Sequence, residues 1–473
     1  MIGGENKIMS QFIKNFFTKK EVDHTLKLYL WVVVFVAGFS LMAISFIQPT
    51  YILLVDLLVI IMVVLVEYPR LGLYGMILFY PFLNWQLVRG SINVPYVDIL
   101  ASLTLLALII RHAIRFFYSD KQDNKKTRYE LPGLLMALVF FAVCALSVLN
   151  NQELVPAFKY LLRPIVFFYL MFVLIPSNLI NSKQIFKTAL HLFLISGLFV
   201  AISGFLSVIL SQGPSWFVYR AVPFSFAGFN PIGGNHNAIA EILIVIIPLT
   251  LILYLLSTKI KQRGWYVLAI LFMTLVLLLT FSRSGWLVLL VELLILYIMR
   301  YKYKFNRYVI VAIIFLLVLV PVLTYFTAWH QVDWIKSSNS NRLLLTSLSF
   351  SHFLDHPIIG NGLNTFQSLV GRTFIYTVEF GDPLESHGFV QKLLTETGIL
   401  GFLSFVGLLI YLGSKYLKGY AKAKFLTNKR IITCLMMVFV GLVLFELFST
   451  SYFVANMWLP IGVGLAGVKL YSE

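Results

Sequence analysis

Residues 237–256 read NAIAEILIVIIPLTLILYLL, and this run decides the fold because it stays apolar over the length of one membrane crossing. A helix needs about 20 consecutive apolar residues to span the hydrocarbon core of a bilayer. Similar runs occur at Leu28–Ile47, Trp265–Phe281 and Tyr308–Phe326. A membrane β-barrel would instead show segments of about ten residues in which apolar and polar positions alternate. The sequence therefore predicts membrane-spanning helices.

The composition of the whole chain agrees with this interpretation, since 59% of the residues are hydrophobic and only 12% are charged. Such values do not suit a globular protein with a solvated surface. We predict an all-α polytopic membrane protein with about 12–14 transmembrane helices and one long extracytoplasmic loop that contains short helices. The predicted parts are a cytoplasmic N-terminal segment (1–27), a transmembrane helix bundle (28–327), the extracytoplasmic loop (328–386) and C-terminal transmembrane helices (387–473).

Charge placement predicts the orientation, because lysine and arginine near a membrane are retained on its cytoplasmic side. Most of the 37 lysine and arginine residues fall in loops on one side of the predicted spans, together with both termini. We therefore expect both termini in the cytoplasm. The same bias explains the net charge of +17 through topology and anionic lipid, so a nucleic-acid partner is not expected.

The long outer segment is largely polar and should carry the chemistry. Residues 339–357 predict a helix that begins at Asn or Ser and ends near a proline. Gly360 and Gly362 then suit a tight turn, and Asn364 or Thr365 should open another short helix.

His387 is the first choice for a catalytic group, since it begins the next apolar run at the outer face in ESHGFVQKLLTETGILGF. A helix N-terminus disfavours a positively charged imidazole. A neutral imidazole at that position can take a proton from a sugar hydroxyl, as a general base must. The alternative is a histidine that only caps the helix by hydrogen bonding.

Several arginines on the outer side could hold a negatively charged substrate. Arg283, in TFSRSGW, lies at the junction of two spans with almost no loop between them. A guanidinium held against lipid needs an anionic partner, and it can bind a phosphate with two parallel hydrogen bonds. Together with a histidine at the mouth of another span, the proposed substrate-binding set is Arg220, Arg283, Arg342, Arg163 and His236. An arginine that only reaches toward lipid headgroups is the alternative at each of these positions.

The outer segments do not predict a metal site. His236 and Glu241 are five residues apart, which does not place them on one helix face. His352 and His356 are four apart, but no acidic or cysteine side chain is placed to complete a site. No cofactor is expected either, since the inner loops contain no phosphate-binding glycine turn.

The order of these motifs resembles the O-antigen ligase and polymerase superfamily of bacterial membrane glycosyltransferases. The resemblance rests on GNHNAIAE and FSRSGW, each opening a span, followed by an arginine, HPIIGNGLNTF and SHGFVQKLLTETGILG around the long outer loop. It covers residues 230–403. Family members often have His-Asn or His-Ser where this chain has His387-Gly388.

The resemblance implies that the protein transfers a glycan from an undecaprenyl diphosphate carrier to an acceptor hydroxyl at the outer face of a bacterial plasma membrane, without a nucleotide sugar or a metal. It assigns His387 as the base and Arg220 and Arg283 as the cations that hold the diphosphate. Arg342 would have a positioning role in the loop.

Three functions remain open from the sequence. We favour a polymerase that joins lipid-linked repeat units into a capsular, teichuronic-type, exopolysaccharide or O-antigen chain, with a flippase or chain-length regulator as partner proteins. A ligase differs only in its acceptor, which would be a lipid A core. A transporter or flippase of lipid-linked glycans would need buried carboxylates as proton relays but no base on an outer loop.

Overall fold

The computed structural model describes residues 36, 38, 40, 48–89, 92–118, 129–212, 220–225, 227–301, 332–450 and 452–472. The chain divides into two compact units, Met1–Leu71 with Leu106–Asp120 and Gly72–Leu105 with Lys121–Glu473. The predicted span at 308–326 lies outside the described residues, as do all but three residues of the span at 28–47.

The all-α membrane fold is confirmed. Among the described residues, seven helices are long and apolar enough to cross a membrane, or up to eight if a bent pair of helices is counted as one span. The strands of this part of the chain are β1 (Gln86–Arg89) and β2 (Ile92–Pro95), which form one antiparallel hairpin.

The first unit contains α3 (Pro49–Glu67) and the later part of α5 (Tyr96–Tyr118). Arg111 of α5 closes the end of α3, because its Nη1 donates to the carbonyl oxygens of Val66 at 3.2 Å and Glu67 at 2.7 Å. These carbonyls lie at a helix C-terminus, where they have no partner within their own helix.

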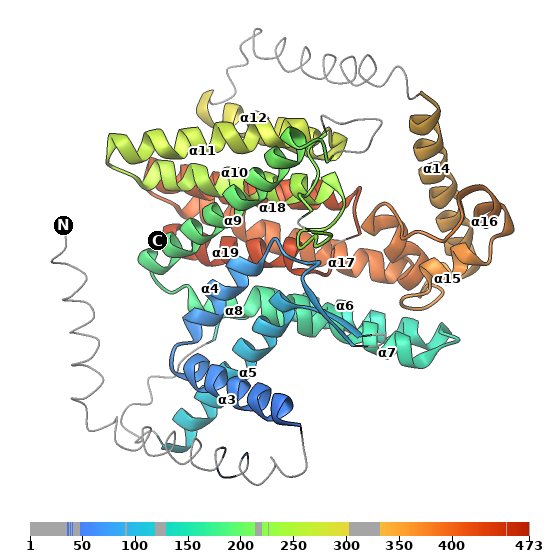
Figure 1. Cartoon of the computed structure of the whole chain (residues 1–473), viewed down its shortest axis with the longest axis horizontal. Helices are drawn as coiled ribbons and strands as arrows, with labels where there is room; N and C mark the ends of the chain where they lie inside the picture. Colours follow the sequence, from blue (N-terminus) through green and yellow to red (C-terminus); the bar gives the residue numbers. More distant parts are fainter. Residues whose placement is uncertain are drawn as a thin grey trace. The chain divides into compact units, whose positions relative to one another are not determined.

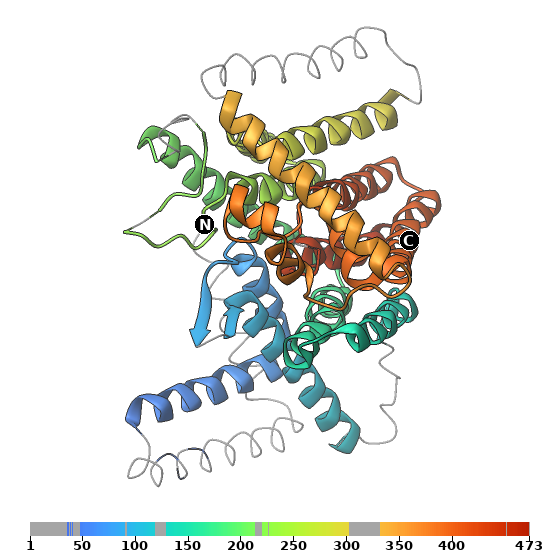
Figure 2. The same ribbon diagram turned by 90° about the vertical axis from the view of Figure 1, so that its right-hand side faces the viewer.

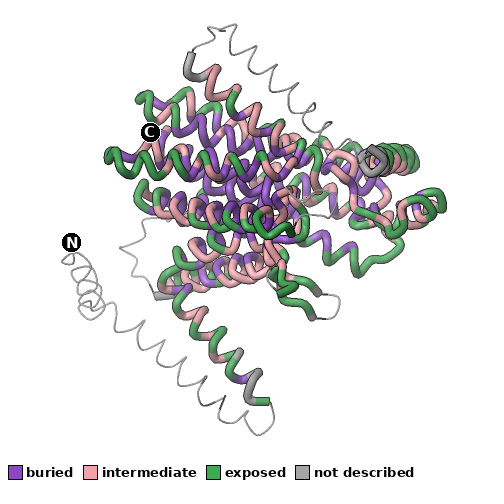
Figure 3. Tube along the Cα trace, turned by 45° about the horizontal axis from the view of Figure 1, so that its top comes forward, coloured by how far each residue is buried: buried purple, intermediate pink, exposed green. Residues whose placement is uncertain are grey.

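The core of the second unit is a helix bundle, in which several helices run side by side around α10 (His236–Leu256), as Figure 1 shows. Most residues of α10 between Ile239 and Leu253 are buried, as expected for a helix that is apolar on every side. Figure 3 shows buried residues gathered along the inner helices of this unit. The surrounding helices are α9 (Lys183–Ile209), α11 (Ile260–Leu279), α12 (Arg283–Tyr301), α18 (Leu426–Glu446) and α19 (Ala455–Ser472).

A second group of helices packs around α17 (Phe389–Lys422) and α19. Close packing on α19 depends on small residues, since a side chain at Gly462 would collide with the backbone of Phe172. On the same helix, Trp458 stacks on Phe168 with ring centroids 4.3 Å apart. The other members are α6 (Leu134–Ser147), η2 (Val148–Asn150), α7 (Leu154–Leu162), the π-helical segment η3 (Arg163–Leu174) and α8 (Ile175–Leu179). The helix α4 (Pro69–Phe79) contacts α9 instead, where the Ser196 hydroxyl donates to the carbonyl of Ile77 at 3.1 Å.

The segment predicted to lie outside folds into a small helical subdomain of α14 (Val332–Asp355), α15 (Phe366–Gly371) and α16 (Phe374–Phe380), seen beside one end of α17 in Figures 1 and 2. We call it the outer subdomain after this prediction. Its apolar core consists of Leu345, Phe366, Val370 and Tyr376. The predicted helix end before Pro357 and the short helix opened by Thr365 are confirmed.

The predicted start of the first outer helix is wrong, because α14 already runs at Val332, ahead of Asn339 and Ser340. Asparagine and serine are strong starting signals, but they also fit inside a helix when their side chains face water. Ser340 is exposed.

The turn at residues 357–362 is built into a break in α17. Gly398 has φ +64° and ψ −166°, which interrupts the helix and leaves backbone groups without helical partners. The turn supplies them: the N–H of Asn361 donates to Thr395 at 2.9 Å, and the N–H of Ile399 donates to Pro357, also at 2.9 Å. As predicted, Gly360 makes a tight turn, with φ +74°. The break therefore joins the outer subdomain to α17.

Replacing Gly398 with alanine is expected to lower the free energy of unfolding by about 2–4 kcal/mol. A Cβ there would meet the backbone of Ile358, and the left-handed φ disfavours any L side chain. The measurement is the thermal unfolding temperature of the detergent-purified protein. Gly407→Ala is the matched control on the same helix, since its Cβ would meet nothing within 4 Å. Equal unfolding temperatures for Gly398→Ala and the wild type would contradict this account of the break.

Candidate functional site

Two helices begin next to each other at one end of the bundle. α10 begins at His236 and α12 begins at Arg283. The Ser282 hydroxyl donates to the side-chain oxygen of Asn237 at 2.8 Å, which links the two helix starts. Their N–H groups and dipoles favour negative charge at this place.

Arg283 lies where the sequence places it, directly after a three-residue turn between α11 and α12. Phe281 in this turn takes a φ of +52°, which is uncommon for a residue with a side chain. The turn brings the end of α11 and the start of α12 together, so Arg283 is held on a short and constrained connection.

Arg220 is held against the end of α11 by its own segment of backbone. The N–H of Ala221 donates to Leu279 at 2.8 Å, and the Nε of Arg220 donates to Thr280 at 3.2 Å. Both acceptors are carbonyls of the helix terminus.

Arg342 reaches the site from α14, in the outer subdomain. Its Nε is buried and has no hydrogen-bond partner within the described part of the chain. A buried donor without a partner is costly, so an acceptor supplied by a ligand would stabilise it.

Arg283 repels both of the other arginines. Burial, and then the charge of Arg283, lower the pKa of Arg220 to about 10, so this guanidinium stays charged at neutral pH. The same two causes lower the pKa of Arg342. The His236 imidazole lies within electrostatic range of all three guanidinium groups. An anion bound among these groups would offset the repulsion.

His387 belongs to this group because Arg342 acts electrostatically on its imidazole. The imidazole is half-buried, and burial, followed by the positive charge of Arg342, lowers its pKa. The expected position at the start of a helix is nearly right: α17 begins at Phe389, and His387 lies two residues before it in a bend of the chain. The imidazole is therefore uncharged at neutral pH and can accept a proton.

The backbone around residue 388 leaves no room for a side chain. A Cβ at this position would collide with the carbonyl oxygen of Leu447, directly after α18. An asparagine or serine at this position would not fit this backbone without a shift of residue 447.

The structure thus brings together five of the predicted site residues: Arg220, Arg283, Arg342, His236 and His387. Arg163 instead contacts residues outside this group. Arg163 begins η3, and its Cζ lies 5.3 Å from the centre of the Phe453 ring. Its charge also acts on Asp98 of α5. Arg163 could not be separated from the other predicted outer arginines by sequence, because all lie near apolar and aromatic residues.

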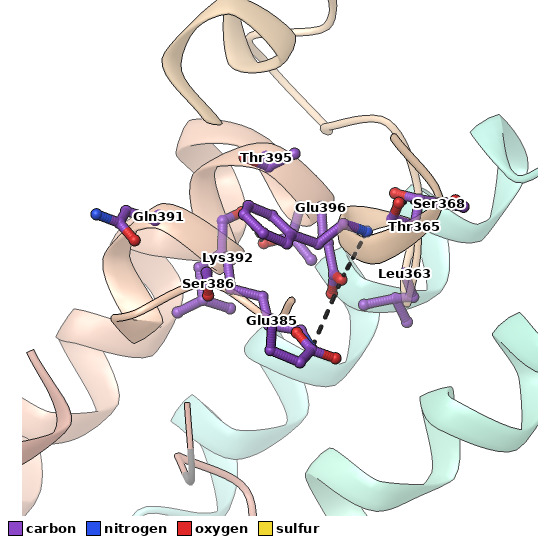
Figure 4. A network of polar contacts seen from close by, with 12 residues as sticks. Leu363, Thr365, Ser368, Glu385, Ser386, Gln391, Lys392, Thr395 and Glu396 are labelled. Carbon is purple, nitrogen blue, oxygen red and sulfur yellow. Dashed lines mark hydrogen bonds and ion pairs between the residues drawn. The ribbon is translucent and has the colours of Figure 1, made fainter. Parts of the chain in front are cut away.

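Sequence reasoning missed a buried ion cluster next to His387. Lys392 and Glu396 lie one turn apart on α17 with their charged atoms 3.8 Å apart, and Glu385 joins them from the chain before His387. Figure 4 shows these side chains converging. The four-residue spacing of Lys392 and Glu396 was a usable signal for their pairing.

Within the described ranges, no group of three or more histidine, cysteine, aspartate or glutamate side chains is placed to share a metal ion. His352, four residues before His356, contacts Asp355 at 3.4 Å.

Comparison with known proteins agrees with the motifs. No curated protein matches the chain. The family model described as O-antigen ligase matches residues 268–406. This range begins in α11, contains Arg283, Arg342 and His387, and ends within α17. The match covers less than half of the chain, and it supports the resemblance of residues 268–406 to the O-antigen ligase and polymerase superfamily.

Proposed function

We propose that the protein is a polymerase that joins oligosaccharide repeat units carried on undecaprenyl diphosphate at the outer face of a bacterial plasma membrane. The family indicates glycan transfer of the ligase or polymerase type. The observation that carries the proposal is a group of arginines in which Arg283 repels Arg220 and Arg342, together with a half-buried histidine on which Arg342 acts.

The arginines suit the donor diphosphate. During transfer, the bond between sugar C1 and the diphosphate oxygen breaks, and negative charge grows on the leaving group. Fixed guanidinium groups in a partly buried site stabilise that charge most when it is fully developed. Arg283 acts electrostatically on both Arg220 and Arg342, so a diphosphate bound close to Arg283 would meet the positive charge of all three.

His387 suits the acceptor side of the reaction. The acceptor hydroxyl oxygen would attack C1 from the side opposite the diphosphate, and the hydroxyl proton would pass to the neutral imidazole. The configuration at C1 then inverts in a single step, and the lipid diphosphate leaves. No covalent bond to the enzyme and no metal ion is required.

The test uses purified protein and undecaprenyl-diphosphate-linked repeat units, with EDTA present. Longer lipid-linked chains, seen by gel or mass spectrometry, are the expected product. Transfer only after a lipid A core is added would replace the polymerase with a ligase. Movement of the lipid across vesicles without any transfer would overturn the proposal, and a need for added metal would remove its metal-free chemistry.

We expect the pH dependence of extension to change when the positive charge of Arg342 is removed. Since His387 has a lowered pKa, the neutral base persists at acidic pH, and kcat/KM should fall only below the usual histidine pKa of about 6.5. Arg342→Gln removes a positive charge next to the imidazole and raises its pKa, so this fall should move to higher pH. The measurement is the pH profile of kcat/KM.

Arg372→Gln is the control for this prediction. Arg372 is an exposed arginine of the same outer subdomain that donates to Gln152 at 2.8 Å. Its profile should match the wild type. A shift to lower pH in Arg342→Gln, or no shift, would show that Arg342 does not act on the base.

A further inference from the structure

Lys392 forms a buried ion pair with Glu385, which lies two residues before the proposed base in the chain. Its side chain is 2% exposed, and its Nζ donates to the Glu385 Oε2 at 2.7 Å (Figure 4). The Glu396 carboxylate, 1% exposed, lies 3.8 Å away on the same helix. A buried ammonium is retained only when it is paired, so Lys392 depends on these carboxylates.

Aromatic rings enclose the ammonium group. The Nζ of Lys392 lies 5.2 Å from the centre of the Tyr160 ring and 5.8 Å from that of Phe453. Arg163 contacts the same Phe453 ring from η3. The faces of these rings attract cations and exclude water, which strengthens the pairing with Glu385. Lys392 is therefore fixed on several sides.

The pairing acts on the short segment that carries His387. Glu385 lies two residues before the histidine, in chain without regular structure. On the other side, the N–H of Lys392 donates to Gly388 at 3.3 Å, and the Ser386 hydroxyl donates to the same carbonyl at 3.1 Å. The segment from Glu385 to Gly388 is thus attached to α17 at both ends.

Glu396 extends the attachment to the outer subdomain. Its Oε1 accepts the N–H of Phe366, the first residue of α15, at 3.2 Å. The adjacent Thr395 shares a hydrogen bond of 2.8 Å with Ser349 of α14. The helix α14 also carries Arg342. The same part of α17 therefore holds both the segment that contains His387 and the helix that contains Arg342.

We propose that Lys392 is a positioning residue, which through its ion pair with Glu385 fixes His387 for proton transfer. This inference rests on the proposed function. The imidazole needs a fixed direction toward the acceptor oxygen, and a displacement of about 1 Å can cost 10²-fold in rate. Lys392 itself is enclosed by protein, so its effect on the reaction would pass through Glu385.

The test compares Lys392→Met, Glu385→Gln and Lys392→Arg. Methionine keeps most of the volume of the stem but cannot hold Glu385, so kcat for extension should fall by about 10- to 100-fold. The donor KM should change by less than about twofold, because the diphosphate contacts remain. Glu385→Gln should act in the same direction, and Lys392→Arg should recover part of kcat because the charge returns.

Lys418→Met is the matched control, since Lys418 is an exposed lysine on the same helix. It should have wild-type kcat and KM. Thermal unfolding of each variant shows whether the protein is folded. Should Lys392→Met fail to fold, Glu385→Gln carries the test, because Glu385 is 36% exposed and tolerates loss of its charge better.

Failure of this inference differs from failure of the proposed function. Wild-type kcat in folded Lys392→Met and Glu385→Gln, with His387→Ala inactive, would overturn the positioning role alone. A raised donor KM with unchanged kcat would also overturn it, since Lys392 would then serve donor binding. Full activity in His387→Ala would instead remove the proposed base.

Discussion

Replacing His387 with alanine is expected to reduce kcat for extension of lipid-linked glycans by about 10²- to 10⁴-fold, the usual contribution of a general base. The imidazole is half-buried and its pKa is lowered by burial and then by Arg342, so the neutral form that accepts protons dominates at neutral pH. Alanine leaves the arginines in place. The donor KM should therefore stay close to that of the wild type, as measured by product formation at several donor concentrations.

His356→Ala is the matched control, because His356 is an exposed histidine of the same outer subdomain. It should extend chains at the wild-type rate. Wild-type kcat in His387→Ala would show that another group removes the proton.

The same position also tests the predicted topology. Cys144 and Cys434 are buried, so a His387→Cys variant supplies an accessible thiol of its own. We expect a membrane-impermeant maleimide to label it from outside intact cells. Labelling only after the membrane is opened would place the site in the cytoplasm and remove the proposed reaction from the outer face.

Local sequence signals predicted the parts of this site that depend on neighbouring residues. Arg283 could be placed because two apolar runs meet at it, and such runs fix the ends of helices. The turn at Gly360 and the end of α14 before Pro357 follow from backbone preferences of glycine and proline. Each of these features is decided within a few residues.

Features that depend on distant parts of the chain could not be predicted in this way. Gly398 looks like any glycine in an apolar helix, and its break exists because residues 357–362 supply the missing hydrogen bonds. The pairing of Lys392 with Glu385 needs the chain to turn back on α17 before the helix starts. Arg163 resembles the other outer arginines until the fold places it against Phe453.

Replacing Arg283 with alanine is expected to reduce kcat/KM for the donor by about 10²- to 10³-fold, the usual cost of removing one group that stabilises charge in a transition state. Arg283 acts on both Arg220 and Arg342, so it is central to the group. Arg283→Lys should recover only part of the loss, because lysine supplies the charge without the paired donors of a guanidinium. The measurement is the initial rate of extension at several donor concentrations, with Arg372→Ala as the control.

The loss of Arg283 should reduce activity without reducing stability, which separates a binding role from a structural one. Arg283 repels its neighbours in the free protein, so Arg283→Ala should unfold at the same temperature as the wild type or a higher one. Added lipid diphosphate should raise the unfolding temperature of the wild type, since a ligand stabilises the state that it binds, and should raise that of Arg283→Ala much less. A lower unfolding temperature of Arg283→Ala without ligand, with equal stabilisation of both proteins by the lipid, would mean that Arg283 supports the fold and does not hold the diphosphate.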